Sequence, residues 1–131
     1  MELTAIIEKK STGFSGYFKE IDSLTTVGDT IEEIKANFRE LLNEYISYLE
    51  EEGKETLEWK KSIINYVIDI EQLFDYYKVI NKTAFAKYIG INPILFRQYT
   101  KKLVPISDQR MRKITEGIHR LADELNTVVL Y

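Results

Sequence analysis

The chain has 131 residues, of which 44% are apolar and 30% charged, and a formal net charge of −3, which fits one small globular unit or two very small ones. It contains no cysteine and only one histidine, His119, so disulfides, thiol nucleophiles and zinc sites built on cysteine or several histidines are excluded. No stretch approaches the roughly 20 consecutive apolar residues of a membrane span. The N-terminus lacks the basic start and apolar core of a secretion signal. We therefore expect a cytoplasmic protein with no membrane partner and no cofactor.

The net charge hides two halves of opposite sign. Residues 1–77 hold 17 acidic and 8 basic side chains, a net charge of −9, whereas residues 78–131 hold 4 acidic and 10 basic side chains, a net charge of +6. Such a split favours two modules with different partners. The basic half is a candidate for phosphate backbones, and the acidic half for a cationic protein or for solvent alone.

The acidic half opens with short strands. Residues 3–8 form an apolar and β-branched run, residues 9–13 break it, and residues 14–19 resume it, which is typical of a β-hairpin. Residues 23–27 predict a third strand. After a later polar connection, residues 62–70 predict a strand that returns to the same sheet.

A long helix lies between the third and fourth predicted strands. Thr30 and Glu33 fit a capping box at its start, and Gly53 marks its end. Its glutamates predict a strongly negative exposed face, for which a solvated surface is the more common reading. Apolar residues recur at steps of three and four and predict one stripe packed on the sheet: Ile31, Ile34, Phe38, Leu41, Tyr45 and Leu49.

Three features of residues 2–52 occur together: the hairpin with Gly13 and Phe14, the short third strand, and the sequence Gly-Asp-Thr-Ile-Glu-Glu-Ile at residues 28–34. In this combination the segment resembles the N-terminal domain of HicB-type antitoxins. The resemblance implies, for residues 1–70, an α+β fold: a small sheet with one packed helix, like a degenerate ribonuclease H that has lost catalysis. It also implies a partner, a HicA-like toxin that cleaves mRNA and is neutralised by this half.

A metal-dependent nuclease is the enzymatic alternative for the acidic half. It would need several carboxylates converging on two cations about 4 Å apart. The candidates have no diagnostic spacing, and ordinary surface carboxylates explain them more simply; they are Glu8, Glu20, Asp22 and Asp69. We therefore predict no catalytic residue, no metal ligand and no enzymatic activity.

The basic half returns to helical periodicity. Residues 71–79 predict a first helix, Asn81 is the N-cap of a second helix that ends at Gly90, and Asn92 followed by Pro93 begins a third. Two short helices joined by a turn with one glycine are typical of a helix-turn-helix. Five roles that this motif requires, a small residue at the helix contact, a glycine in the turn and apolar residues that pin the second helix, are filled in the expected order by Ala86, Gly90, Ile91, Phe96 and Tyr99. Phe85 and Ile89 are also expected to face the core. A helical hairpin that merely packs is the alternative.

Placing the third helix in a DNA major groove assigns roles to its outward side chains. Arg97 can pair with guanine and Gln98 with adenine, while Asn92 lies at the helix start, where backbone N–H groups meet phosphate. Ile94 also points outward, either toward a thymine methyl group or against a neighbouring element. Each lysine of the set is, taken singly, more often a solvated surface residue. The full predicted DNA-binding set is Lys82, Thr83, Asn92, Pro93, Arg97, Gln98, Lys101 and Lys102.

The C-terminal segment predicts one more helix and an uncharged end. Ser107 is its N-cap, and one face carries the stripe Met111, Ile114, Ile118, Leu121 and Leu125. The other face extends the positive surface with Arg110, Arg112, Lys113 and Arg120. His119 is interpreted as structural or exposed. Residues 127–131 are β-prone, so they are expected to add a strand either to the chain's own sheet or to a second subunit.

Residues 73–125 as a whole, through Thr83, Ala86, Gly90, Phe96 and Tyr99, resemble the lambda-repressor-like helix-turn-helix domains of the XRE class. Lys101-Lys102-Leu103 stands where that class often has glycine. HicB-type antitoxins often carry such a domain after the toxin-binding module, so the order of residues 1–70 and 71–131 matches the family.

The leading hypothesis is therefore a type II antitoxin that neutralises a HicA-like toxin and represses its own operon by binding operator DNA. Because palindromic operators need two recognition helices about 34 Å apart, we expect a homodimer or higher oligomer. The alternative is a stand-alone helix-turn-helix regulator whose N-terminal half dimerises or senses a ligand.

Overall fold

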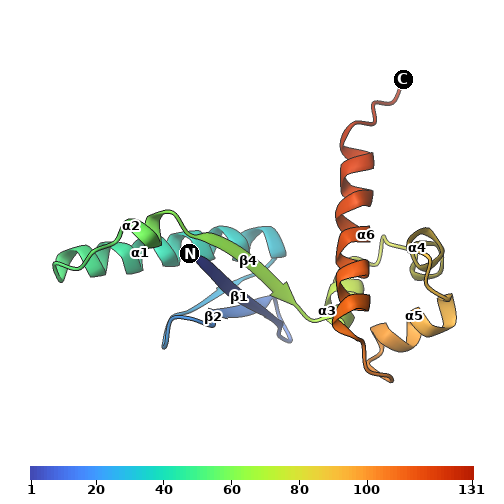
Figure 1. The fold of residues 1–131 in the computed structure, drawn as a ribbon, viewed down its shortest axis with the longest axis horizontal. Helices are drawn as coiled ribbons and strands as arrows, with labels where there is room; N and C mark the ends of the chain where they lie inside the picture. The colour runs from blue at the N-terminus through green and yellow to red at the C-terminus, as the bar shows by residue number, and fades with distance from the viewer. The chain divides into compact units, whose positions relative to one another are not determined.

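A computed structural model describes residues 1–131, which divide into two compact units, Met1–Gln72 (unit 1) and Leu73–Tyr131 (unit 2). The chain is α+β, with one four-stranded mixed sheet and six helices (Figure 1). None of these helices has the length and apolar character that crossing a bilayer requires.

The sheet of unit 1 has the strand order β3-β2-β1-β4. Its strands are β1 (Glu2–Lys9), β2 (Phe14–Phe18), β3 (Thr25–Gly28) and β4 (Ile63–Ile68). The predicted hairpin is confirmed, because β1 and β2 pair antiparallel with Ala5 opposite Phe18, and β2 pairs antiparallel with β3. The returning strand β4 is parallel to β1, with Ala5 opposite Tyr66. Both β3 and β4 are therefore edge strands.

Helix α1 (Ile31–Glu51) begins at the predicted cap, where the Thr30 hydroxyl accepts a hydrogen bond from the Glu33 N–H at 3.0 Å. The predicted stripe was wrong at two positions. Leu42 and Ile46 are buried, whereas Leu41 and Tyr45 lie half-buried on the flank of the helix. The inward face consists of Ile31, Ile34, Phe38, Leu42, Ile46 and Leu49.

A single helical turn explains the position of Tyr45. Residues 57–60, which sequence analysis placed in a polar connection, form α2 (Leu57–Lys60). Trp59 of this turn packs edge-on against the Tyr45 ring, with 5.2 Å between centroids. Lys60 Nζ lies 2.7 Å from Glu50 Oε1, so α2 is tied to the end of α1.

The core of unit 1 lies between α1 and one face of the sheet. Leu3, Ala5 and Ile7 of β1 are at most 3% exposed, and Phe18 of β2 meets Phe38 of α1 edge-on at 5.1 Å between ring centroids. Helix α1 packs mainly against β2 and β3. The core is therefore closed on the β3 side of the sheet.

The core of unit 2 is built on three aromatic rings from three helices. These three helices are α3 (Ile70–Tyr76), α4 (Lys82–Ile89) and α5 (Pro93–Thr100), and a fourth helix, α6 (Asp108–Asn126), follows them. Phe74 lies 5.7 Å from Phe85 and 5.3 Å from Phe96, and Phe85 lies 5.7 Å from Phe96, all between ring centroids. Each ring is at most 4% exposed, so this cluster holds α3, α4 and α5 together.

Helix α6 covers that core with only part of its length. It begins at the predicted N-cap, where Ser107 Oγ accepts from the Arg110 N–H at 3.1 Å. The predicted apolar stripe was wrong at its two ends, because Met111 is 38% exposed and Leu125 is 61% exposed. A helix of 19 residues is about 28 Å long, whereas the eight-residue α4 and α5 span about 12 Å each, so part of α6 extends beyond them (Figure 1).

Two residues of α6 are fully buried, Ile114 and Gly117, while Ile118 and Leu121 are half-buried. A Cβ atom at position 117 would collide with Ile89 Cγ2 of α4, so glycine permits the close approach of the two helices.

The tail beyond α6 forms no strand, so its expected pairing with the chain's own sheet is not observed. Val129 and Leu130 are 89% and 88% exposed.

Candidate nucleic-acid interface

The segment α4–turn–α5 is shaped by its capping residues. Asn81 Oδ1 accepts from the Ala84 N–H at 2.9 Å, which confirms the predicted N-cap of α4. Helix α4 ends at Gly90, whose φ of 75° lies in the left-handed region, and the Ile91 N–H donates to Ala86 O at 2.9 Å. This C-terminal geometry is one that glycine adopts without steric cost. The predicted turn residue is therefore confirmed.

Helix α5 has a cap of its own and a buried inner face. Asn92 Oδ1 accepts from the Ile94 N–H at 2.9 Å and from the Leu95 N–H at 3.3 Å, with Pro93 in the first turn. The positions that were predicted to pack in the core are all buried: Phe85, Ala86, Ile89, Ile91, Phe96 and Tyr99. This burial fixes which side of α5 faces outward.

Three of the eight predicted DNA-binding residues, Pro93, Arg97 and Gln98, lie within α5, and Asn92 and Lys101 cap its two ends. Arg97 and Lys101 are exposed, and Gln98 is half-buried. Ile94 is 70% exposed, so the alternative in which it packs against a neighbouring element of this chain is not observed.

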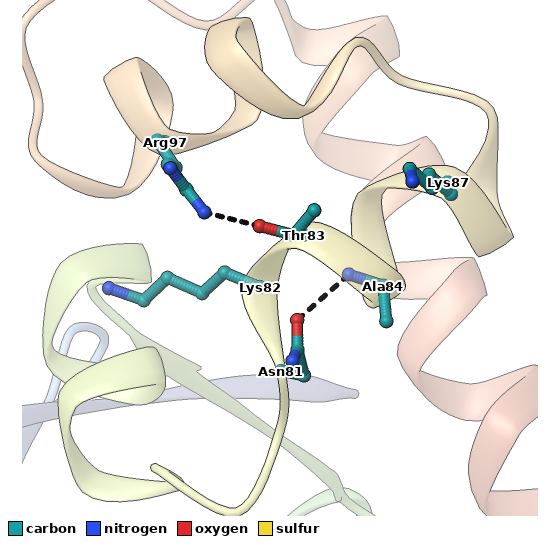
Figure 2. A pocket seen from close by; sticks show the side chains of 6 residues that line it. All are labelled: Asn81, Lys82, Thr83, Ala84, Lys87 and Arg97. Atoms are coloured by element: carbon teal, nitrogen blue, oxygen red, sulfur yellow. Dashed lines mark hydrogen bonds between the residues drawn. The ribbon is translucent and has the colours of Figure 1, made fainter.

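A shallow hollow of about 510 Å³ brings three of the predicted residues together. Arg97 reaches from α5 to the start of α4, where a guanidinium nitrogen donates to the Thr83 hydroxyl, and Lys82 extends on the same side (Figure 2). The lining residues are Asn81, Lys82, Thr83, Ala84, Lys87 and Arg97. Three of them are cations and none is acidic, so the hollow favours an anionic ligand.

The other predicted residues lie outside the hollow: Asn92, Pro93, Gln98, Lys101 and Lys102. The side-chain oxygen of Asn92 caps α5, which leaves its amide NH₂ group as the part that can donate to a ligand. Lys102 has a φ of 59°, which lies in the left-handed region that glycine adopts more easily than lysine. Helix α5 ends there, and the Leu103 N–H donates a hydrogen bond to Gln98 O at 2.9 Å.

Three lining residues, Asn81, Ala84 and Lys87, were not predicted as members of this site. Lys87 follows Thr83 by four residues on α4 and therefore lies on the same helix face. That spacing was a usable signal. Asn81 was recognised only as a cap.

Arg120 differs from the other cations predicted for the outer face of α6. Its Nε donates to the Tyr88 hydroxyl at 3.0 Å, its Nη2 donates to the Tyr88 carbonyl at 3.2 Å, and the guanidinium lies 4.5 Å from the ring centroid. The hydrogen bond to Tyr88 raises the pKa of Arg120. Arg120 therefore ties α6 to α4.

Three of the four carboxylates of the nuclease alternative, Glu8, Glu20 and Asp69, have separate local partners. Glu8 lies 3.9 Å from Lys10 Nζ, and Asp69 Oδ1 accepts from the N–H groups of Glu71 and Gln72. Desolvation acts to raise the pKa of Glu20, but hydrogen bonding to Thr4, whose N–H donates at 2.7 Å, outweighs it and lowers the pKa overall. No three acidic or histidine side chains are grouped so that they could hold a metal ion.

Known protein families, curated proteins and solved structures were compared with this chain, and none matches.

Proposed function

We propose that unit 2 is a helix-turn-helix domain that binds duplex DNA with α5 in the major groove. The observation that carries this proposal is the cationic hollow at the start of α4, where Lys82, Thr83 and Arg97 lie together beside the outward face of α5. Short capped helices around a glycine turn are the architecture that such domains use. Unit 2 also holds 10 basic and 5 acidic side chains, a net charge of +5 that suits a polyanion.

The proposed roles follow from the position of each side chain. Arg97, braced by the Thr83 hydroxyl, pairs with a guanine edge, and Gln98 pairs with adenine. Lys82, Lys87 and Lys101 contact phosphate oxygens, which position the domain without reading the sequence. Ile94 contacts a thymine methyl group, because it is exposed on the same helix and contacts no core.

We propose that unit 1 is the partner-binding module of a HicB-type antitoxin, with a degenerate ribonuclease H-like fold, and that its partner is a HicA-like ribonuclease toxin. Its order of elements, three strands followed by the long helix α1, the short turn α2 and a returning strand, supports this assignment. Unit 1 holds 16 acidic and 8 basic side chains, and the net charge of −8 complements a basic ribonuclease. The whole protein then represses its own operon as a homodimer or higher oligomer.

Paired substitutions test the DNA assignment. Arg97→Ala is expected to relax base preference and to cost about 1–3 kcal/mol on the preferred site. Lys101→Ala is expected to weaken all sequences similarly and to reduce the slope of log K against log salt by about one. Fluorescence anisotropy with promoter and shuffled duplexes across a salt series measures both quantities. Equal effects of the two substitutions on preference and slope would contradict the roles.

The toxin assignment has a separate test. A neighbouring short reading frame that encodes a basic protein of under about 100 residues is the expected partner. Co-expression with this chain should yield a complex and relieve growth arrest, and Arg97→Ala should leave both intact because it lies in unit 2. Growth arrest that persists in the presence of the chain would contradict the antitoxin role.

A further inference from the structure

The two edge strands of the unit 1 sheet are protected to different degrees. Strand β3 has only four residues, and at its outer edge Asn37 Nδ2 donates to the Val27 carbonyl at 2.6 Å. Strand β4 has six residues with the sequence Ile-Ile-Asn-Tyr-Val-Ile, without charge, proline or glycine. Edge strands are normally shielded by charged residues, proline or bulges, because an open edge can pair with a strand of another chain.

The backbone of β4 presents hydrogen-bonding groups away from β1. The Ile63 N–H donates to Met1 O at 3.0 Å, so residue 63 turns toward β1. Alternate residues of a strand turn their backbone groups to opposite edges, so Ile64, Tyr66 and Ile68 present theirs on the outer edge. No other strand pairs with this edge.

The hydrophobic core is also less completely buried on the β4 side, where Tyr66 packs edge-on against Phe38 of α1 at 6.1 Å between ring centroids. Ile64, Tyr66 and Ile68 lie opposite Leu3, Ala5 and Ile7 of β1 in the sheet. The three β1 residues are 0%, 0% and 3% exposed, whereas the three β4 residues are only half-buried. A groove of about 460 Å³ between α1, α2 and the start of β4 includes Trp59 and Ile64 in its lining.

We propose that the outer edge of β4 pairs antiparallel with the β4 strand of a second copy of this chain, around a two-fold axis at Tyr66. The pattern Ile64-x-Tyr66-x-Ile68 is symmetric about its centre. In this register Ile64 lies opposite the second copy's Ile68, and Tyr66 lies opposite its own equivalent. Each of these pairs exchanges two N–H···O=C bonds, and the side chains form matched apolar pairs.

Charge complementarity selects a second copy as the occupant and antiparallel as the direction. Lys61 precedes β4, and Asp69 and Glu71 follow it. A two-fold axis brings the basic start of one strand beside the acidic end of the other at both ends of the pairing. A parallel arrangement would instead place like charges together, which disfavours it.

Single cysteines test this register, because the chain has none of its own. Around Tyr66, Asn65 of one copy faces Val67 of the other in a pair without hydrogen bonds, with about 4.5 Å between Cα atoms. That spacing suits a disulfide, whereas Asn65 to Asn65, or Val67 to Val67, is a diagonal of about 7–8 Å. Both side chains are exposed, so each substitution is compatible with folding, and Trp59 fluorescence verifies it.

The expected result is that mixed Asn65→Cys and Val67→Cys proteins, allowed to exchange and then oxidised, form covalent dimers. The yield should be at least tenfold higher than for either variant alone, measured by non-reducing electrophoresis. Val27→Cys, exposed on β3 at the protected edge, is the matched control and should not bridge with either variant. Equal bridging in the single variants, or none in the mixture, would overturn the proposal. The assay contains no DNA and no toxin, so its outcome is independent of the function proposed above.

Discussion

The two units differ in how completely they bury their cores. In unit 2, the rings of Phe74, Phe85 and Phe96 come from three helices and pack against one another in the core. Gly117 allows the close approach of α6 to α4. In unit 1, α1 packs mainly against β2 and β3, and the β4 side stays half-buried. Unit 2 carries, at the start of α4, a hollow lined by three cations and no acidic residue. Unit 1 instead presents backbone and apolar side chains that suit another protein.

The largest expected effect comes from truncating one core at a time. Phe96→Ala and Phe38→Ala each remove a ring that is 0% exposed and should cost about 3–5 kcal/mol. Trp59, the only tryptophan, lies in unit 1 and reports on that unit alone. Phe38→Ala should lower the unfolding midpoint measured by Trp59 fluorescence. Phe96→Ala should leave that midpoint unchanged and should lower the midpoint of one part of the unfolding transition measured by helical circular dichroism. Identical shifts of both probes in both variants would show that the cores are not separate.

Gly117→Ala tests the tight contact in unit 2. In an exposed helix this substitution is favourable by about 1 kcal/mol. Here the added methyl group collides with Ile89, so the free energy of unfolding should fall by about 1–3 kcal/mol. Glu116→Ala, at the exposed neighbouring position, should change it little. A stabilised Gly117→Ala protein in urea denaturation would refute the close helix contact.

Lys102→Gly should have a smaller effect of opposite sign. Lysine at a φ of 59° carries a left-handed strain that glycine does not, so the substitution should raise the free energy of unfolding by up to about 1 kcal/mol. Lys101→Gly is the matched control, because Lys101 has a φ of −96° and carries no such strain. Glycine there only raises the entropy of the unfolded chain, so it should lower the free energy of unfolding. If both substitutions destabilise the protein equally in urea, the backbone assignment after α5 is incorrect.

The smallest effect concerns the pH dependence of unit 1. The hydrogen bond from Lys60, followed by that from Thr56, lowers the pKa of Glu50 below its ordinary value of 4.5. Because the folded-state pKa is the lower one, this stabilisation is present above about pH 4.5 and is lost as the pH falls through the folded-state pKa. Glu50→Gln should therefore flatten part of the acid-induced decline in the Trp59 unfolding midpoint. An unchanged decline would exclude this contribution.

Features that depend on neighbouring residues could be predicted from the sequence. The caps at Thr30, Asn81, Asn92 and Ser107 are local hydrogen bonds, and each is confirmed. Helix and strand order follow from the same local patterns, and the α+β class is confirmed.

Features that depend on distant contacts could not be predicted. The flank position of Tyr45 depends on Trp59, which lies on a turn with no clear helical pattern. The exposure of Leu125 depends on the shortness of α4 and α5 rather than on the periodicity of α6. The hollow likewise depends on Arg97 reaching Thr83 across 14 residues of sequence. Lys82, Thr83 and Arg97 were named from the sequence, but their meeting at one place follows from tertiary structure.

The most direct test of the central claim is a mobility shift of the full chain on its own promoter fragment and on a shuffled duplex, across a salt series, with wild type and Arg97→Ala in parallel. If α5 reads bases through Arg97, binding should prefer the promoter and weaken with salt, and Arg97→Ala should lose the preference while keeping salt-dependent affinity. Wild-type binding with no preference for the promoter, or a preference that Arg97→Ala retains in full, would contradict the central claim.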